Sequence, residues 1–197
     1  MKINQVPDAL NQYRKKLESY SEISNEDFEQ LADVMHEKHF SKGEVILKEG
    51  DVCKAFNFIY KGLIRSFGLE DGREVNVNFY FENDFACDFG SFRSGEPSKF
   101  YFVAMEDTIA YQGLKSETVP VFEESAPLHF FLFRFFQKLF LDEEEHANSL
   151  KLMSPEERYN YMLEKKSEYL QRIPLTHLAS YLCMSRATLT RMRRKVS

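Results

Sequence analysis

Apolar residues near the N-terminus recur at the spacing of a helix. The positions that carry this pattern are Phe28, Leu31, Ala32 and Met35. Ser24, with Asp27 three residues later, provides an N-cap just before them. The pattern predicts a helix from Ile23 to His36 that leads into the next part of the chain.

The middle of the chain, from Phe40 to about Phe122, alternates short apolar runs with glycine-containing turns. The clearest runs are residues 45–47, 56–60, 75–79 and 100–103. Turns at roughly ten-residue spacing are typical of an antiparallel barrel or roll. Asp71-Gly72 predicts a tight hairpin because both residues tolerate a positive φ angle. This part is therefore predicted to form a jelly-roll-like antiparallel β-roll, within a fold of the α+β class.

A helix that is apolar nearly all round is predicted after Pro127, over residues 128–141. Arg134, Gln137 and Lys138 argue against a membrane span, which needs about twenty apolar residues. Such a soluble helix must be covered on two sides. Its own β-roll can cover one side and the same helix of a second chain the other, which predicts a homodimer; the alternative is a buried central helix of a monomer. The predicted interface residues are Leu128, Phe131, Leu132, Phe135, Phe136 and Leu139.

The last part of the chain returns to helical spacing. Ser154 and Pro155 predict the start of a helix that runs to about Tyr169 or Leu170. Pro174 separates this helix from two short amphipathic helices. Their apolar faces are Leu175, Leu178, Ala179 and Leu182 in the first helix, and Leu189, Met192 and Val196 in the second.

A turn over Cys183, Met184 and Ser185 joins these two helices, and Ser185 is predicted to cap the second. Opposite its buried stripe, the second helix keeps an arginine-rich side that suits phosphates and guanine edges. This layout indicates a helix-turn-helix with its recognition helix last; the alternative is an ordinary helical hairpin with a solvated basic tail. The residues on the free side are Arg186, Ala187, Thr190, Arg191 and Arg194.

The charge distribution supports the same interpretation. The formal net charge of −5 speaks at first against a nucleic-acid partner. However, residues 154–197 hold nine basic and four acidic side chains, a net of +5, so the remainder carries −10. The last twelve residues hold five positive charges and no negative one. A basic C-terminal part is what DNA binding requires.

Cysteine usage indicates a reducing compartment. Cys53, Cys87 and Cys183 are odd in number and far apart in the sequence, with no Cys-x-x-Cys pair. This argues against a disulfide framework, a structural zinc site or an iron–sulfur cluster. The N-terminus lacks the apolar core of a signal peptide. We therefore expect a cytoplasmic protein, with no metal and no cofactor.

The order and spacing of three segments resemble the Crp/Fnr family of transcription regulators. Residues 41–51 and 59–65 are similar to the family's β-roll, and the terminal twenty residues to its helix-turn-helix. The resemblance implies a sensor β-roll over 1–124, a dimerisation helix over 125–152 and a DNA-binding domain over 153–197 that lacks a full β-wing. It implies a cytoplasmic homodimer that binds a pseudo-palindromic operator in double-stranded DNA and works with RNA polymerase.

The resemblance also assigns roles within the second short helix. Ser185, Arg186, Thr188 and Arg191 match family positions that contact phosphates and bases. Ala187 stands where a glutamate that reads cytosine is common, so the operator sequence does not carry over. Cys183 replaces the usual turn glycine. The full predicted DNA-binding set is Ser185, Arg186, Ala187, Thr188, Thr190, Arg191, Arg193, Arg194 and Lys195.

The nucleotide site of the family matches less well. Nucleotide-binding members use Gly-Glu for the ribose and Arg-Ser for the cyclic phosphate, but Cys87-Asp88 and Ser98-Lys99 stand at these places here. Lys is no bidentate substitute for the missing arginine. Glu143 and Glu144 fall where relatives contact the adenine, and their charge would oppose a phosphate. The tentative effector pocket, made of these six residues, predicts an effector other than cyclic AMP, or none.

Other functions fit the sequence less well. His36 and His39 are interpreted as a solvated pair at a helix end, so they suggest no haem ligand. A cupin-type metalloenzyme would need a His-x-His motif, which is absent. We therefore do not expect an enzyme. The alternative function is a cyclic-nucleotide-binding-like interaction module that does not bind DNA on its own.

Overall fold

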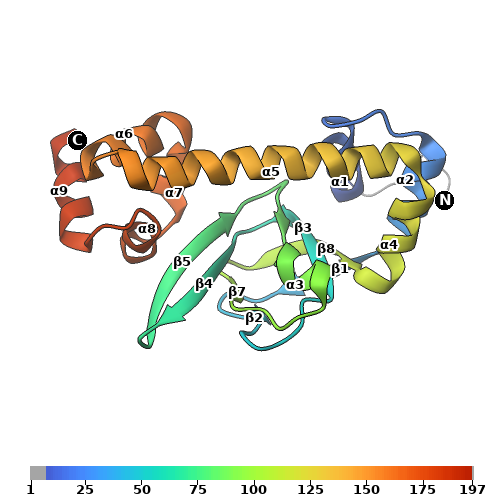
Figure 1. Cartoon of the computed structure of the whole chain (residues 1–197), viewed down its shortest axis with the longest axis horizontal. Helices are drawn as coiled ribbons and strands as arrows, with labels where there is room; N and C mark the ends of the chain where they lie inside the picture. Colours follow the sequence, from blue (N-terminus) through green and yellow to red (C-terminus); the bar gives the residue numbers. More distant parts are fainter. Residues whose placement is uncertain (1–7, 197) are drawn as a thin grey trace. The chain divides into compact units, whose positions relative to one another are not determined.

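The computed structural model describes residues 8–196, with side chains described as far as Arg194. The chain divides into two compact units. The first contains residues up to Ser66 with Phe79–Gln137, and the second Phe67–Asn78 with residues from Lys138 onward. Helix α5 (Ala126–Leu152) is one continuous helix with residues in both units (Figure 1). The domain boundaries expected from the sequence stay predictions.

Two helices, α1 (Asp8–Glu18) and α2 (Asn25–Asp33), precede the β-roll. Ser24 caps α2 as predicted, since its side chain accepts a hydrogen bond of 3.1 Å from the amide of Asp27. The prediction that this helix continues to His36 is wrong. Strand β1 (Met35–Phe40) follows at once and pairs along its whole length with β8 (Thr108–Leu114). Pairing with β8 supplies the hydrogen-bond partners for the backbone groups of residues 35–40. The segment therefore forms a strand although its apolar residues have helical spacing.

In the described part of the chain, two four-stranded sheets form the β-roll (Figure 1). The strand order is β1-β8-β3-β6 in the first sheet and β2-β7-β4-β5 in the second. Strand β3 pairs antiparallel with both β8 and β6, and β2 pairs antiparallel with β7. The remaining strands are β2 (Val45–Leu47), β3 (Ala55–Lys61), β4 (Ile64–Glu70), β5 (Arg73–Tyr80), β6 (Phe85–Ala86) and β7 (Tyr101–Ala104).

The predicted β-roll is confirmed, and its limits shift. Asp71 and Gly72 form the turn between β4 and β5 with φ angles of 50° and 75°, as their sequence predicts. The β-region ends earlier than Phe122, because helix α4 (Lys115–Glu124) follows β8 directly. The short helix α3 (Phe89–Ser94) lies between β6 and β7, a segment for which no helix was predicted.

The largest core cluster joins the N-terminal helices to the first sheet. Tyr13 of α1 lies fully buried with its ring centroid 4.9 Å from that of Phe58 in β3. Phe85 of β6 contacts both rings, at 6.0 and 5.4 Å. A smaller cluster holds Ile59 and Phe102 together with Ile64 and Ala86. Burial of such aromatic side chains is the main stabilising contribution expected here.

Helix α5 begins at a serine cap and contributes its first turns to the same core. The amide of Leu128 donates a hydrogen bond of 3.2 Å to the hydroxyl of Ser125. Leu128 and Phe131 are buried at 0% and 2% exposure within the first core cluster. The helix does not stop at Leu141 but continues through four consecutive acidic residues to Leu152. The predicted long helix is confirmed.

Four helices make up most of the second unit: α6 (Pro155–Lys165), α7 (Ser167–Arg172), α8 (Leu175–Tyr181) and α9 (Arg186–Val196). Ser154 caps α6 as predicted, and Glu157 completes a capping box with it. The prediction that this helix runs to Tyr169 or Leu170 is wrong, because Lys166 leaves the helical region at φ −139° and ψ 46° and separates α6 from α7.

Candidate functional site

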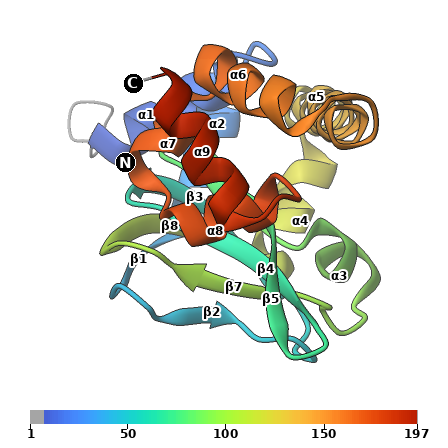
Figure 2. The ribbon, with the colours of Figure 1, turned by 90° about the vertical axis from the view of Figure 1, so that its left-hand side faces the viewer.

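Helices α8 and α9, with the turn between them, form the predicted helix-turn-helix (Figure 2). Cys183 adopts a φ of 50°, the left-handed conformation that glycine enters most easily. Ser185 caps α9, because its hydroxyl accepts a hydrogen bond of 3.1 Å from the amide of Thr188. The two helices share a buried face made of Leu178, Ala179, Tyr181, Leu182, Leu189 and Met192. Tyr181 is an addition that the sequence pattern did not include.

Arg158 of α6 holds the turn from inside the unit. Its guanidinium donates hydrogen bonds to the carbonyls of Leu150 at 3.0 Å, Met153 at 3.3 Å and Cys183 at 3.5 Å. Only 8% of Arg158 is exposed. Although Arg158 is one of the nine basic residues counted between residues 154 and 197, its charge is therefore buried and not available at the surface. A positive charge at the carbonyl end of α5 is also favoured by the helix dipole. Arg158 therefore positions the turn against the end of α5.

Residues of the β4–β5 hairpin contact α8 within the same unit. The amide of Asn76 donates to the hydroxyl of Ser180 at 3.0 Å, and the side-chain nitrogen of Asn76 lies 3.4 Å from Nδ1 of His177. The sequence analysis missed this contact, because the paired residues are 104 and 101 positions apart and no local pattern links them.

The predicted DNA-binding residues lie on the side of α9 away from its buried face. Arg186, Ala187, Arg191 and Arg194 are exposed, as are Ser185 and Arg193, while Thr188 and Thr190 are half-buried. No carboxylate among the described residues forms an ion pair with Arg186, Arg191 or Arg194. The side chains of Lys195 and Val196 lie outside the described residues. The helix thus presents one face with unpaired guanidinium groups.

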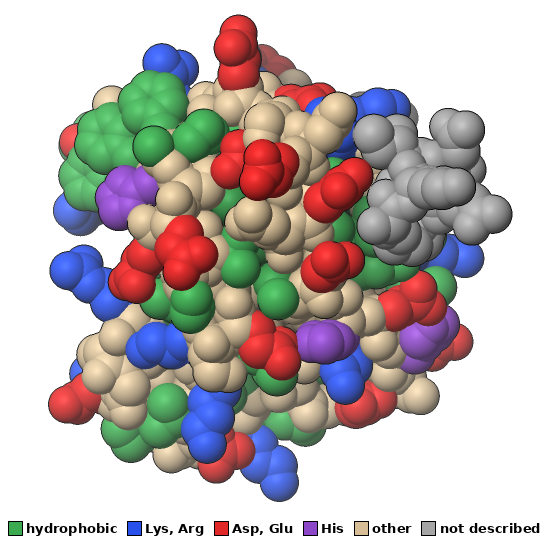
Figure 3. All heavy atoms as spheres, turned by 90° about the vertical axis from the view of Figure 1, so that its right-hand side faces the viewer, with side chains coloured by type: hydrophobic (Ala, Val, Ile, Leu, Met, Phe, Trp, Pro, Cys, Tyr) green, Lys and Arg blue, Asp and Glu red, His purple; other side chains and the backbone are tan. Residues whose placement is uncertain are grey.

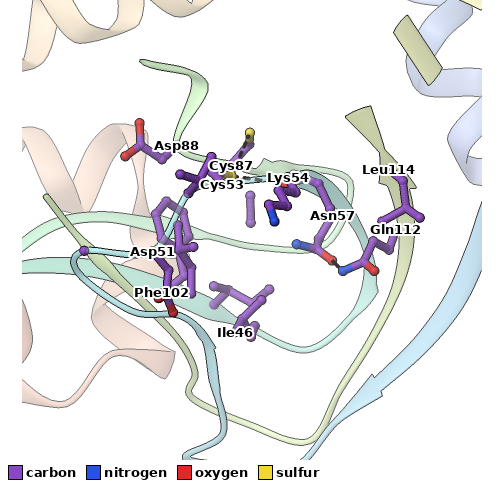
Figure 4. A pocket seen from close by; sticks show the side chains of 16 residues that line it. Ile46, Asp51, Cys53, Lys54, Asn57, Cys87, Asp88, Phe102, Gln112 and Leu114 are labelled. Carbon is purple, nitrogen blue, oxygen red and sulfur yellow. Dashed lines mark hydrogen bonds between the residues drawn. The ribbon is translucent and has the colours of Figure 1, made fainter. Parts of the chain in front are cut away.

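A cavity of about 540 Å³ lies in the β-roll. Figure 4 shows Asn57 and Gln112 on one side of it, joined by a hydrogen bond of 3.1 Å, and Cys53 and Cys87 together on another. The charged residues of its lining are Asp51, Lys54 and Asp88. The full lining is Ile46, Leu47, Gly50, Asp51, Val52, Cys53, Lys54, Ala55, Asn57, Ile64, Ala86, Cys87, Asp88, Phe102, Gln112 and Leu114.

Only two of the six predicted pocket residues line this cavity, namely Cys87 and Asp88. Asp88 also serves the fold, because one carboxylate oxygen caps α3 at the amide of Ser91, 3.1 Å away. The other accepts a hydrogen bond of 2.7 Å from the buried hydroxyl of Ser98. Ser98 and Lys99 do not line this cavity: Ser98 is buried and donates to Asp88, and Lys99 is exposed, so their place in an effector site stays a prediction. No arginine is present among the described lining residues.

Glu143 and Glu144, the other two residues of the tentative pocket, belong to the second unit, so their place in an effector site stays a prediction. Both are exposed residues of the part of α5 that belongs to the second unit, and neither lines the cavity. Burial raises the pKa of Glu143, although the charge of Lys166 opposes this shift.

Cys53 and Cys87 are neighbours in the cavity wall, with their sulfur atoms 3.8 Å apart and both thiols free. The hydrogen bond from the thiol of Cys87 lowers the pKa of Cys53 to about 7, and the backbone amide of Asp88 acts in the same direction. Burial raises the pKa of Cys87. The sequence analysis named Cys87 for another reason and missed Cys53, because the pairing of β3 with β6 brings the two together only in the fold.

The histidine pair does not lie at a helix end, which corrects the earlier interpretation. His36 and His39 are exposed residues of strand β1. The Nε2 of His36 lies 2.8 Å from a carboxylate oxygen of Glu117, and that of His39 lies 2.7 Å from one of Glu37. Each imidazole thus has its own carboxylate partner. Among the described residues, no group of three or more histidine, cysteine and acidic side chains could hold a metal ion.

Helix α5 exposes several apolar side chains. Figure 3 shows hydrophobic side chains gathered at the upper left of the view, over the beginning of this helix. The prediction that Leu128 and Phe131 form a dimer interface is wrong, because both lie in the core of their own chain. Leu132, Phe135 and Leu139 are half-buried, and Phe136 is exposed. The exposed apolar side chains of α5 are Phe130, Phe133, Phe136, Phe140, Leu141 and Leu152.

No helix among the described residues is long and apolar enough to cross a membrane.

Comparison with known proteins gives consistent matches. The family model of the cyclic nucleotide-binding domain matches residues 37–118. The structure of FixK2 from Bradyrhizobium japonicum is similar over 83% of this chain and 84% of its own, at 20% identity and a TM-score of 0.71. The c-di-GMP-responsive global regulator CLP of Xanthomonas campestris is similar over 88% and 91%, at 16% identity and a TM-score of 0.70.

A third similar structure is a transcriptional regulator of the crp/fnr family from Eubacterium rectale. It covers 96% of this chain and 87% of its own, at 17% identity and a TM-score of 0.68. No match was found among curated protein sequences.

Proposed function

We propose that this chain, which carries a cyclic nucleotide-binding domain and has the fold of Crp/Fnr-type transcription regulators, is a cytoplasmic homodimeric regulator that binds double-stranded DNA. The observation that carries this proposal is the face of α9 with Arg186, Arg191 and Arg194, set on a buried helix-turn-helix core. Unpaired guanidinium groups on a helix of this kind suit base edges and phosphates.

The exposed apolar side chains of α5 support the proposed dimer. A soluble protein rarely leaves several phenylalanines of one helix in water, and an isologous contact between two copies would cover them. A symmetric dimer presents two copies of α9 and therefore prefers a pseudo-palindromic operator. RNA polymerase is the partner that such a regulator would meet at a promoter.

The effector in this proposal is a small molecule other than cyclic AMP, or none. The described cavity lining holds no arginine, and the carboxylates of Asp51 and Asp88 are unfavourable for a cyclic phosphate.

Selection from a random duplex pool tests the DNA-binding function. We expect enrichment of an inverted repeat with half-sites about one helical turn apart. Replacing Arg186 or Arg191 by Ala should cost about 1–3 kcal/mol on the selected site and reduce discrimination between sites. Replacing Arg193 or Arg194 should weaken all duplexes alike and lower the salt slope by about one per lost phosphate contact.

Arg172→Ala is the matched control, because it removes the same charge from the same unit at a residue that pairs with Glu168. This variant should bind the selected duplex as the wild type does. If no inverted repeat is enriched and binding does not depend on salt, the chain is an interaction module and not an autonomous DNA-binding protein.

A further inference from the structure

The cavity in the β-roll contains a pair of thiols that the proposed function does not use. Cys53 precedes β3 and Cys87 follows β6, and the register of Asn57 opposite Ala86 holds these strand ends side by side. The two sulfur atoms are 3.8 Å apart, whereas a disulfide bond measures about 2.05 Å. Disulfide formation therefore requires the two sulfur atoms to approach each other by roughly 1.8 Å.

The surroundings give the two sulfur atoms different roles. The thiol of Cys87 and the amide of Asp88 donate hydrogen bonds toward Cys53, which lowers the pKa of Cys53 to about 7. A thiol with a pKa near the ambient pH is the best attacking group, since it combines thiolate population with nucleophilicity. Burial raises the pKa of Cys87, so in the reduced pair Cys53 is the more readily ionised sulfur and Cys87 is left as the second, resolving group.

The cavity gives a small oxidant access to this pair. Both cysteines line its wall, and its volume of about 540 Å³ far exceeds that of a peroxide molecule. Cys183 offers a contrast within the same chain. It is exposed, lies on the turn of the helix-turn-helix and has no neighbouring thiol among the described residues.

We propose that Cys53 and Cys87 form a peroxide-reactive dithiol whose oxidation to an intrachain disulfide regulates DNA binding. The Cys53 thiolate attacks one peroxide oxygen, the O–O bond breaks, and the departing hydroxide takes up the proton that Cys53 released, which gives water and a sulfenic acid on Cys53. The sulfur of Cys87 then attacks that of Cys53, the S–S bond forms, and the S–O bond breaks with release of a second water that carries the Cys87 proton. One peroxide is reduced to two waters as two thiols are oxidised.

The disulfide would act on the segment that supports the cavity. The amide of Cys53 donates to the hydroxyl of Ser91 at 2.9 Å, and that hydroxyl donates to the carbonyl of Glu96 at 2.5 Å. Cys87 directly precedes Asp88, the N-cap of α3. A bond between the two sulfur atoms therefore constrains both attachments of α3. The regulatory consequence rests on the proposed DNA-binding function, whereas the thiol chemistry does not.

The chemistry is tested on the full reduced chain with hydrogen peroxide, followed by alkylation and peptide mapping by mass spectrometry. We expect the wild type to lose two hydrogens and to yield a linked peptide pair containing Cys53 and Cys87, with Cys183 still alkylated. Cys183→Ser should behave like the wild type. Cys87→Ser should stop at a dimedone-reactive sulfenic acid on Cys53, and Cys53→Ser should form neither product.

Oxidation of Cys183 before the other two, or a first sulfenic acid on Cys87, would overturn the proposed chemistry. For regulation, duplex affinity is compared between the reduced and oxidised Cys183→Ser protein. We expect a change of about tenfold, a usual size for coupling between two sites, and none in Cys53→Ser. If the disulfide forms while affinity stays constant, the regulatory step is refuted. If neither form binds DNA, the proposed function fails and the thiol result stands alone.

Discussion

A single residue shows how closely the chain passes its neighbouring strand where it leaves β3, which pairs with β8 in the first sheet. Gly62, between β3 and β4, has a φ of +108°, and its amide donates to a carboxylate oxygen of Glu82 at 2.8 Å. A Cβ at this position would lie 2.4 Å from the hydroxyl oxygen and 2.8 Å from the Cα of Thr108. Glycine is therefore required twice, for its backbone angle and for the missing Cβ.

Replacing Gly62 by Ala should destabilise the chain by about 2–4 kcal/mol, because backbone strain adds to overlap with a buried strand. Gly43→Ala is the control, since Gly43 also has a positive φ, of +87°, but nothing lies within 4 Å of its added Cβ. It should cost only about 1–2 kcal/mol. Urea unfolding of both variants measures the difference, and equal losses would show that the contact with Thr108 relaxes freely.

At the scale of elements, α5 combines two surfaces in one helix. Its first turns bury Leu128 and Phe131 in the core of the first unit, while Phe133 and Phe140 are exposed at 62% and 67%. This division explains why its sequence is apolar nearly all round. One side packs in the core of the first unit, and the other side is the interface of the proposed dimer.

The double substitution Phe133→Glu and Phe140→Glu should separate the proposed dimer, because two carboxylates would be buried in each half of the interface without a cation. Light scattering at micromolar concentration should show a wild-type dimer and a variant monomer with unchanged circular dichroism. Leu69→Glu, on the exposed side of β4, should remain dimeric. A monomeric wild type would contradict the interface on α5.

For the whole molecule, the cavity and the arginine face belong to different units. Helix α5 and the hairpin of β4 and β5 contribute residues to both. The hairpin reaches α8 through Asn76, which bonds to Ser180 at 3.0 Å. These shared elements are the covalent routes by which an event in the cavity can bias the helix-turn-helix, as a two-state coupling between sites requires.

Cyclic AMP should bind this molecule weakly, with a dissociation constant well above about 1 μM. The binding free energy would then be weaker than about −8 kcal/mol. The reason is the missing guanidinium in the described lining, together with an Asp88 carboxylate already used by Ser91 and Ser98. Isothermal calorimetry measures this constant, and a titration of the same sample with its selected duplex confirms that the protein is active. A submicromolar value would contradict the account of the cavity.

What the sequence alone determined rests on local patterns. Alternation and turns predicted the β-roll, helical spacing predicted α5 and the helix-turn-helix, and Ser24, Ser154 and Ser185 each cap the predicted helix. These features depend on residues a few positions apart, so their physics is visible in the sequence. The resemblance drawn from the same residues agrees with the matching domain model and the similar structures.

Only the tertiary structure decided which distant residues meet. The pairing of β1 with β8 ends α2 at Asp33, and the pairing of β3 with β6 brings Cys53 to Cys87. The fold also decided the place of Lys99, which the family resemblance assigns to the effector pocket. Lys99 is exposed and does not line the cavity of the β-roll. Strand register and helix packing are set by contacts between segments far apart in the chain, and such contacts leave no periodic signal in either segment by itself.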